Sequence, residues 1–412
     1  MRKSPELLVP AGSLEVLKTA VIFGADAVYI GGASFGLRAK AKNFTGEEMR
    51  TGIEFAHQQG AKVYITANIL AHNRDIPEVR RYFQEIKEMG PDGLIIADPG
   101  VFQIALEECP EIERHISTQA NNTNVATFDF WHKMGASRVV TARELTLDEI
   151  KEIRANVSKE LEIETFVHGA MCISYSGRCL LSNYFTNRDA NRGACTHPCR
   201  WKYYLVEETR PNEFMPVYEN ERGTYIFNAK DLCMIAHIPA LIESGIDSFK
   251  IEGRMKNALY VATVARTYRK AIDDYLQKPE IYERNMPWYQ EQIANCTYRQ
   301  FTTGFFFGNQ DENAQIYNQN TYEKNYTYLG IVEEYLEAGE YAGFIFLEQR
   351  NKFSVGETIE IMKPDGQNIK TKVQGIINEA GEEQESCPHS KQKLFVKLDQ
   401  AAVQYDILRR AE

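Results

Sequence analysis

Two things that this sequence lacks limit what the protein can be. No run approaches the ~18 apolar residues of a membrane-spanning helix, and the chain opens Met1-Arg2-Lys3-Ser4 without the apolar segment of a secretory signal. Positive charge is also in deficit, since 47 Lys and Arg stand against 57 Asp and Glu, a net charge of −10. We therefore expect a cytoplasmic protein with no membrane contact, whose binding to any nucleic acid must come from a local basic patch.

Several catalytic signatures are absent as well. The sequence has no His-Glu-x-x-His and no Gly-x-Ser-x-Gly, and Cys172 lacks the surroundings of a papain-like or caspase-like nucleophile. Gly31-Gly32 follows an apolar run, but no G-x-G-x-x-G fingerprint is found there. These absences argue against the common hydrolases and against a doubly wound dinucleotide-binding sheet.

The length and the order of apolar runs predict the fold. At 412 residues, 43% apolar and 25% charged, the chain has an ordinary globular composition and is long enough for two domains. Apolar runs alternate with amphipathic stretches through residues 1–278, which favours a parallel (β/α)8 barrel of the TIM type. The expected strands are Leu7–Val9, Ala27–Ile30, Lys62–Ile65, Leu94–Ile96, His115–Ser117, Arg138–Val140, Ile163–Val167 and Ser248–Ile251.

The remaining segments differ from the barrel in pattern. Residues 171–233 form a cysteine-bearing insertion after the seventh strand, with 203–206 and 225–228 expected as a hairpin inside it. Residues 279–324 are expected to be a linker that packs back onto the barrel. From residue 325 to 412, short alternating strands at 329–332, 341–347, 357–362, 370–377 and 393–398 predict a small all-β barrel.

Five of the eight cysteines lie in the insertion: Cys172, Cys179, Cys195, Cys199 and Cys233. Disulfides are disfavoured in a reducing cytoplasm. Zinc usually takes two short knuckles, and only Cys195 and Cys199 make one. A nucleophilic thiol needs one unligated cysteine of low pKa. A [4Fe–4S] cluster requires only converging thiolates and tolerates long, irregular spacings. The spacing alone leaves zinc, a reactive thiol and a cluster open.

Polar residues follow several of the expected strands and predict a polar cup at the carboxyl end of the barrel, where the active sites of such barrels lie. They are Asn68, Asp98, Thr118, Gln119, Arg143, Glu144 and His168. His168 is our candidate catalytic residue because imidazole transfers protons near neutral pH. An alternative role is to orient a loop or a sulfur atom.

Cations gather on the same expected face. Arg178, Arg200, Lys250 and Arg254 are our candidates for binding an anionic substrate, either a dicarboxylate or an RNA phosphate. The alternative is structural, with Glu252 paired to Lys250 or Arg254 to hold the barrel closed.

Several long motifs carry a family resemblance. The run Glu164-x-Phe166-x-x-Gly169-Ala170-Met171-Cys172-x4-Gly177-x-Cys179-x-Leu181-Ser182 resembles the signature of the collagenase-like peptidase family, number thirty-two among peptidases of unassigned catalytic type. The likeness continues through Asn191–Tyr203, Asn228–Cys233, Phe249–Arg254 and Arg299-x3-Thr303-Gly304-Phe305, and it covers nearly the whole chain.

The resemblance implies a function that composition does not. The motifs look most similar to the members that convert the wobble uridine of tRNA to 5-hydroxyuridine with prephenate and without molecular oxygen. It implies a [4Fe–4S] cluster on Cys172, Cys179, Cys195 and Cys233, with Cys199 as the alternative ligand. tRNA and prephenate are the partners implied. The family name implies the rival reading, a metal- or thiol-dependent protease, and a non-catalytic RNA-binding scaffold is a third.

Overall fold

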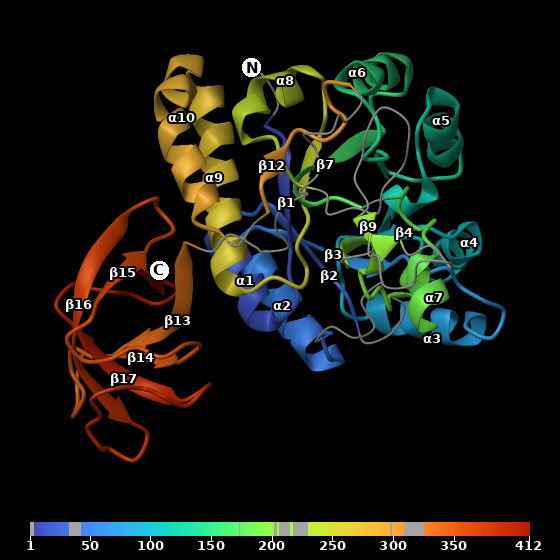
Figure 1. Cartoon of the computed structure of the whole chain (residues 1–412). Coiled ribbons are helices and arrows are strands. Elements are labelled where there is room, and N and C mark those ends of the chain that lie inside the picture. Colours follow the sequence, from blue (N-terminus) through green and yellow to red (C-terminus); the bar gives the residue numbers. More distant parts are fainter. Residues whose placement is uncertain are drawn as a thin grey trace.

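The chain folds into a parallel barrel and a smaller antiparallel barrel that lie side by side (Figure 1). The computed structural model describes residues 4–32, 43–172, 174–201, 204–205, 215–216, 230–296, 299–308 and 325–412. Within these residues, no helix is both long enough and apolar enough to cross a membrane.

Eight parallel strands close the larger barrel, as the sequence predicts. Their order is β1-β2-β3-β4-β5-β6-β7-β11, and β11 pairs with both β1 and β7. The bounds are β1 Glu6–Pro10, β2 Ala27–Ile30, β3 Lys62–Ala67, β4 Gly93–Ile96, β5 Glu113–Ile116, β6 Arg138–Val140, β7 Glu162–Ala170 and β11 Ser248–Ile251. Apolar residues predominate in these strands, but charged residues also lie in them, among them Arg138, Glu164 and Lys250.

Helices cover the outside of this barrel and bury the apolar side chains that lie between helices and strands. They are α1 Leu14–Ile22, α2 Gly46–Gln58, α3 Ile76–Lys87, α4 Pro99–Glu108, α5 Val125–Lys133, α6 Leu147–Asn156, α8 Ile238–Glu243 and α9 Ala258–Gln277. Capping boxes start two of them: Thr45 with Glu48 on α2, and Thr146 with Glu149 on α6. Each box satisfies backbone donors that the first helical turn leaves open, which fixes where the helix begins.

The carboxyl end of the barrel carries short elements. They are the 3-10 turns η1 Thr118–Ala120, η2 Ala190–Arg192, η3 Pro198–Arg200 and η4 Ile235–His237, the helix α7 Leu181–Thr186, and the strands β10 Asp231–Cys233 and β12 Phe301–Thr302. Strand β10 runs antiparallel to β7, and β12 pairs with β10, an extension that the sequence does not predict. A buried ion pair of 2.6 Å between Asp231 and Arg299 joins the segments that hold these two strands.

The predicted hairpin is different in the structure. Strand β8, Tyr204–Leu205, pairs with β9, Met215–Pro216. Residues 225–228, the partner that we expect from the sequence, lie outside the described residues.

Part of the expected linker is regular helix. Helix α10, Pro279–Ala294, packs along α9. The Tyr289 hydroxyl donates to the Asp274 carboxylate of α9 over 2.5 Å, and the Asn285 amide donates to the same carboxylate over 2.8 Å. Pro287 lies inside this helix and interrupts the helical signal in the sequence.

The C-terminal residues form a closed antiparallel barrel of six strands in the order β13-β14-β17-β16-β15-β18. The bounds are β13 Tyr326–Tyr335, β14 Ile345–Glu348, β15 Thr358–Met362, β16 Asn368–Asn378, β17 Lys393–Leu398 and β18 Ile407–Ala411. Five of these strands are predicted; β18, which closes the barrel between β13 and β15, is not. Closure leaves no open sheet edge.

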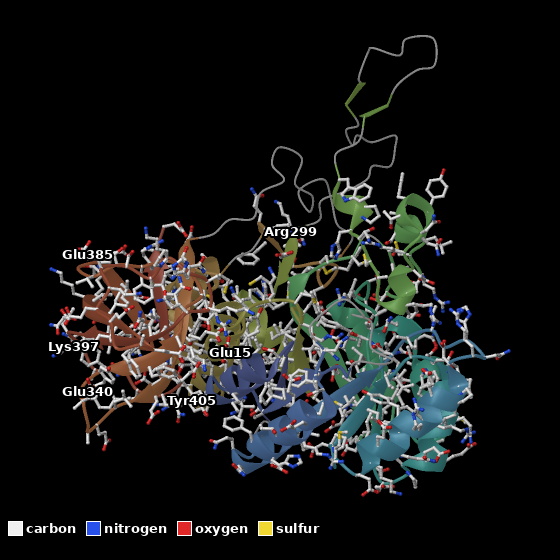
Figure 2. All side chains as sticks on the ribbon, turned by 90° about the horizontal axis from the view of Figure 1, so that it is seen from below. Glu15, Arg299, Glu340, Glu385, Lys397 and Tyr405 are labelled. Atoms are coloured by element: carbon white, nitrogen blue, oxygen red, sulfur yellow. The ribbon has the colours of Figure 1, made fainter. Side chains whose placement is uncertain are left out.

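The two barrels share a buried contact. Tyr328, Ile331, Met362 and Ile407 of the small barrel belong to the same apolar core as the outer helices. At its border Glu15 of α1 pairs with Arg350, and Figure 2 shows Glu15 at the junction of the blue helices and the orange barrel.

Candidate active site at the mouth of the larger barrel

A cavity of about 320 Å³ opens at the carboxyl end of the larger barrel. Its floor comes from barrel residues, among them Tyr29, Ile95 and Phe166. Its rim comes from strand ends and from the insertion that follows β7. The volume lies within the range of small-molecule sites, and the position is the usual active face of this fold.

The polar cup predicted from the strand ends is present in part. Asn68, Thr118, Gln119 and Arg143 line the cavity. Asp98 instead caps α4, where its carboxylate accepts from the Val101 amide over 2.9 Å, and neither it nor Glu144 is a lining residue.

Four of the five clustered thiols share this cavity. Cys172, Cys179, Cys195 and Cys199 line it, Cys172 being exposed and the other three partly buried. The surrounding loops are tied by hydrogen bonds: the Asn191 amide donates to the Cys179 carbonyl over 3.0 Å. The fold thus brings together residues separated by up to 27 positions in the chain.

Cys233, the fourth ligand that the family resemblance implies, is partly buried at the edge of the same region. It is on β10, opposite His168 of β7, and it does not line the cavity. Its Sγ is 3.9 Å from the Tyr268 hydroxyl, and burial raises the pKa of this thiol to about 11. Its place in a cluster with the other thiols stays a prediction.

The thiols fit an iron–sulfur cluster in chemistry, because such clusters are held by cysteine thiolates. Four thiols facing one water-accessible cavity supply a complete donor set of that kind. Among the described residues, no three His, Cys, Asp or Glu side chains form a group that could hold a metal ion.

His168 is buried, with 1% of its surface exposed, and does not line the cavity. Its ring packs among Tyr260, Tyr268 and Phe301, and its Nδ1 is 3.4 Å from the Tyr268 hydroxyl. Burial lowers the pKa of this imidazole to about 4, so the ring is neutral near pH 7. Its catalytic role stays a prediction; the position resembles the alternative one, a side chain that orients its neighbours.

A shift in strand register explains this position. On β7, Phe166 is opposite Lys250, but the next pair along β11 is Ile251 with His168, so Val167 is an extra residue. Phe166 and Lys250 line the cavity. Regular alternation would put His168 on the same face as Phe166, and an irregularity of this kind re-aims the side chain that follows it.

Lys250 is part of a buried charge cluster inside the barrel. Its Nζ is 2.7 Å from Glu164 Oε1, and 4.7 Å from the centre of the Tyr29 ring. The other oxygen of Glu164 accepts from Arg138 over 3.0 Å. Burial alone would raise the pKa of Glu164, but Lys250 and Arg138 outweigh it and hold that pKa below its usual value. Lys250 is therefore held in place at the cavity by a buried carboxylate.

Arg254 also lines the cavity and is buried. Its Nη1 donates to the Thr66 hydroxyl over 2.9 Å. Gly31 leaves room for this guanidinium, because a Cβ at position 31 would stand 2.3 Å from Nη1. The same would hold at Gly12, whose Cβ would be 2.3 Å from the Arg254 carbonyl oxygen. Gly31 thus leaves room for the guanidinium of Arg254, and Gly12 leaves room for its backbone.

Arg143 is a cavity cation that we did not include among the binding candidates. Its Nη1 donates to the Ala170 carbonyl over 2.9 Å, its guanidinium lies 4.0 Å from the Phe166 ring centre, and Nη2 is 3.5 Å from Glu252. Its position just after the sixth strand was the signal in the sequence that could have identified it as a binding residue. Glu252 thus pairs with Arg143, and Lys250 pairs with Glu164.

The two remaining predicted binding residues are outside this group. Arg178 is exposed, does not line the cavity, and donates from Nε to Asn121 Oδ1 over 2.7 Å. Arg200 falls in η3, and its side chain lies outside the described part of the chain.

Comparison with known proteins agrees with this architecture. The family model for peptidase family U32 matches residues 12–316, and that for the family's C-terminal domain matches residues 324–409. The chain belongs to the U32 peptidase family.

Named relatives extend over the whole chain. "tRNA hydroxylation protein P1" of Bacillus subtilis is 41% identical over 410 residues, covering 100% of this chain and 96% of the relative. "tRNA hydroxylation protein P" of Escherichia coli is 37% identical, covering 98% and 96%. An Escherichia coli synthase of 5-hydroxycytidine in 23S rRNA is 37% identical over 66% of this chain and 40% of its own length.

Proposed function

We propose that this protein is an RNA-hydroxylating enzyme that acts on tRNA. The observation that carries the proposal is the cavity at the barrel mouth, which four thiols and four Lys or Arg side chains line on the active face of the fold. Relatives named for tRNA hydroxylation match the chain from end to end, and one named for hydroxycytidine synthesis in rRNA matches two thirds of it.

The product proposed is 5-hydroxyuridine at the wobble position, made with prephenate and without molecular oxygen. A base must leave its stack to enter a cavity of this size. Asn68, Thr118 and Gln119 supply neutral donors and acceptors suited to the edge of a base. Lys250, Arg254 and Arg143 supply the charge that a dicarboxylate such as prephenate requires.

A [4Fe–4S] cluster on Cys172, Cys179 and Cys195 is the proposed cofactor. A [4Fe–4S] cluster held by four thiolates would supply one-electron transfer. Cys199 is the fourth ligand favoured by position, because it lines the cavity with the other three, whereas the family resemblance favours Cys233.

Analysis of tRNA nucleosides tests the function. In cells lacking the protein, wild-type chain should restore 5-hydroxyuridine, Cys179→Ala should not, and Cys109→Ala should, since Cys109 is buried away from the cavity. Modification that persists with Cys179→Ala would overturn a thiol-dependent reaction. Wobble uridines that wild type leaves unmodified, together with cleavage of peptide substrates, would favour the protease that the family name implies.

Metal analysis tests the cofactor separately. Anaerobically purified protein should contain about four irons and four sulfides per chain, the content of one cluster. Cys199→Ser should lose most of this iron and Cys233→Ser should keep it; the reverse result would identify Cys233 as the ligand. For prephenate, Arg254→Lys keeps the charge but loses the planar fork, so the KM for prephenate should rise at unchanged iron content.

A further inference from the structure

An exposed aromatic surface lies on the insertion next to the cavity. It consists of Leu180, Tyr184, Phe185 and Trp201, which are 71%, 82%, 43% and 45% exposed. The Phe185 ring links the other two rings, with its centre 5.2 Å from that of Tyr184 and 6.2 Å from that of Trp201. Large aromatic side chains gathered on a surface in this way mark a binding site rather than a solvated face.

This surface borders the cavity directly. Leu181 and Cys199 line the cavity, and they are within two residues of Leu180 and Trp201 along the chain. Hydrogen bonds tie the two parts of the segment together: the Ser182 and Thr196 hydroxyls are 3.0 Å apart, and the Thr196 amide donates to Ser182 Oγ over 3.1 Å. A ligand on the aromatic surface would therefore be held beside the cavity entrance.

The charge of the same segment is opposite to that of the whole protein. The protein carries −10, yet residues 171–201 contain four arginines, no lysine and a single acidic residue, Asp189. Arg178 and Arg188 are exposed, and the Asp189 carboxylate accepts the backbone amide of Asn191 over 2.8 Å. Arg192 pairs with Asp75 over 2.9 Å, so the exposed Arg178 and Arg188 are the candidates for the local positive charge that binding of RNA to an acidic protein requires.

We infer that this surface is the docking site for unpaired nucleotides of the RNA substrate: their bases stack on Tyr184 and Trp201 while Arg178 and Arg188 contact the flanking phosphates. The inference rests on the proposed function and names how that substrate is held. Aromatic faces beside a basic groove are the features by which proteins hold single-stranded nucleic acid, because every base offers a face for stacking. A duplex hides those faces, so the surface selects a splayed loop over a paired stem.

Binding of full-length protein to an RNA stem–loop, compared with a fully paired RNA of the same length, tests the docking site. Tyr184→Leu and Trp201→Leu should each weaken binding of the stem–loop by about 5- to 100-fold, the range for loss of one stacked base. Tyr184→Phe keeps the ring and should bind as wild type does. Arg188→Gln should reduce the slope of log affinity against log salt by about 0.7, the value for one phosphate of a single strand.

The controls separate this inference from the proposed function. Tyr335→Leu, at an exposed aromatic of the small barrel, should leave binding unchanged. Iron content and the circular dichroism spectrum should be the same in all of these variants. Weakened stem–loop binding supports the docking site even if no hydroxylated nucleoside is found. Wild-type affinity in both leucine variants would overturn it, and a changed oligomeric state at unchanged RNA affinity would assign the surface to a protein partner instead.

Discussion

Glu164→Gln should destabilise the larger barrel strongly. The Glu164 carboxylate is fully buried and bonds two cations, Lys250 over 2.7 Å and Arg138 over 3.0 Å. A glutamine amide has only one oxygen that can accept a hydrogen bond. Its NH2 group would face an N–H of the other cation, and two donors cannot bond to each other. Arg138 keeps Glu6 and Glu162 as partners, each at 2.6 Å, so the uncompensated charge is that of Lys250.

The expected loss in the free energy of unfolding is about 3–5 kcal/mol, the cost of removing one partner of a buried pair. Urea unfolding followed by circular dichroism measures it as a lower midpoint at an unchanged slope. Glu160→Gln is the matched control, because Glu160 is exposed, and it should change stability by no more than about 0.5 kcal/mol.

A double variant tests the reason for the loss. Lys250→Met removes the stranded ammonium, so Glu164→Gln combined with Lys250→Met should be more stable than Glu164→Gln alone. A loss below about 1 kcal/mol in Glu164→Gln, or a double variant less stable than the single one, would refute the reasoning from a buried charge cluster.

Three further predictions concern stability. Burial raises the pKa of Glu6, but Arg138 outweighs it and brings the value down from 4.5 to about 2. The ionised carboxylate therefore contributes roughly 3 kcal/mol of stability above pH 4.5, which is lost as the pH falls toward 2. In Glu6→Gln, the free energy of unfolding should fall less steeply over this pH range. In thermal unfolding, Gly12→Ala should cost about 1–3 kcal/mol or more, because its Cβ would lie 2.3 Å from a backbone oxygen. Gly46→Ala is the control in the same assay and should not destabilise, because the nearest atom to its Cβ would be 3.6 Å away. Thr146→Ala removes a capping box and should cost about 1 kcal/mol by urea unfolding, a result that an unchanged midpoint would contradict.

The fold could be predicted where the sequence pattern is long and regular. All eight barrel strands were predictable because short, mostly apolar stretches alternate with amphipathic helical patterns along this part of the chain. Strands β10 and β12 were not, since they have three and two residues and are held by backbone pairing that leaves no periodic signal. Helix α10 was missed because of the proline at position 287.

The candidate site could likewise be predicted only in part. The sequence by itself determined that a thiol-rich insertion follows the seventh strand, that Lys250 is in the last strand and that Arg254 follows it. Which residues meet depended on the tertiary structure. An extra residue in β7 turns His168 away from the cavity, and the pairing of β10 with β7 places Cys233 opposite His168. Composition and spacing fix what groups a chain carries, but strand register and pairing decide which way each side chain points, and one inserted residue is enough to change it.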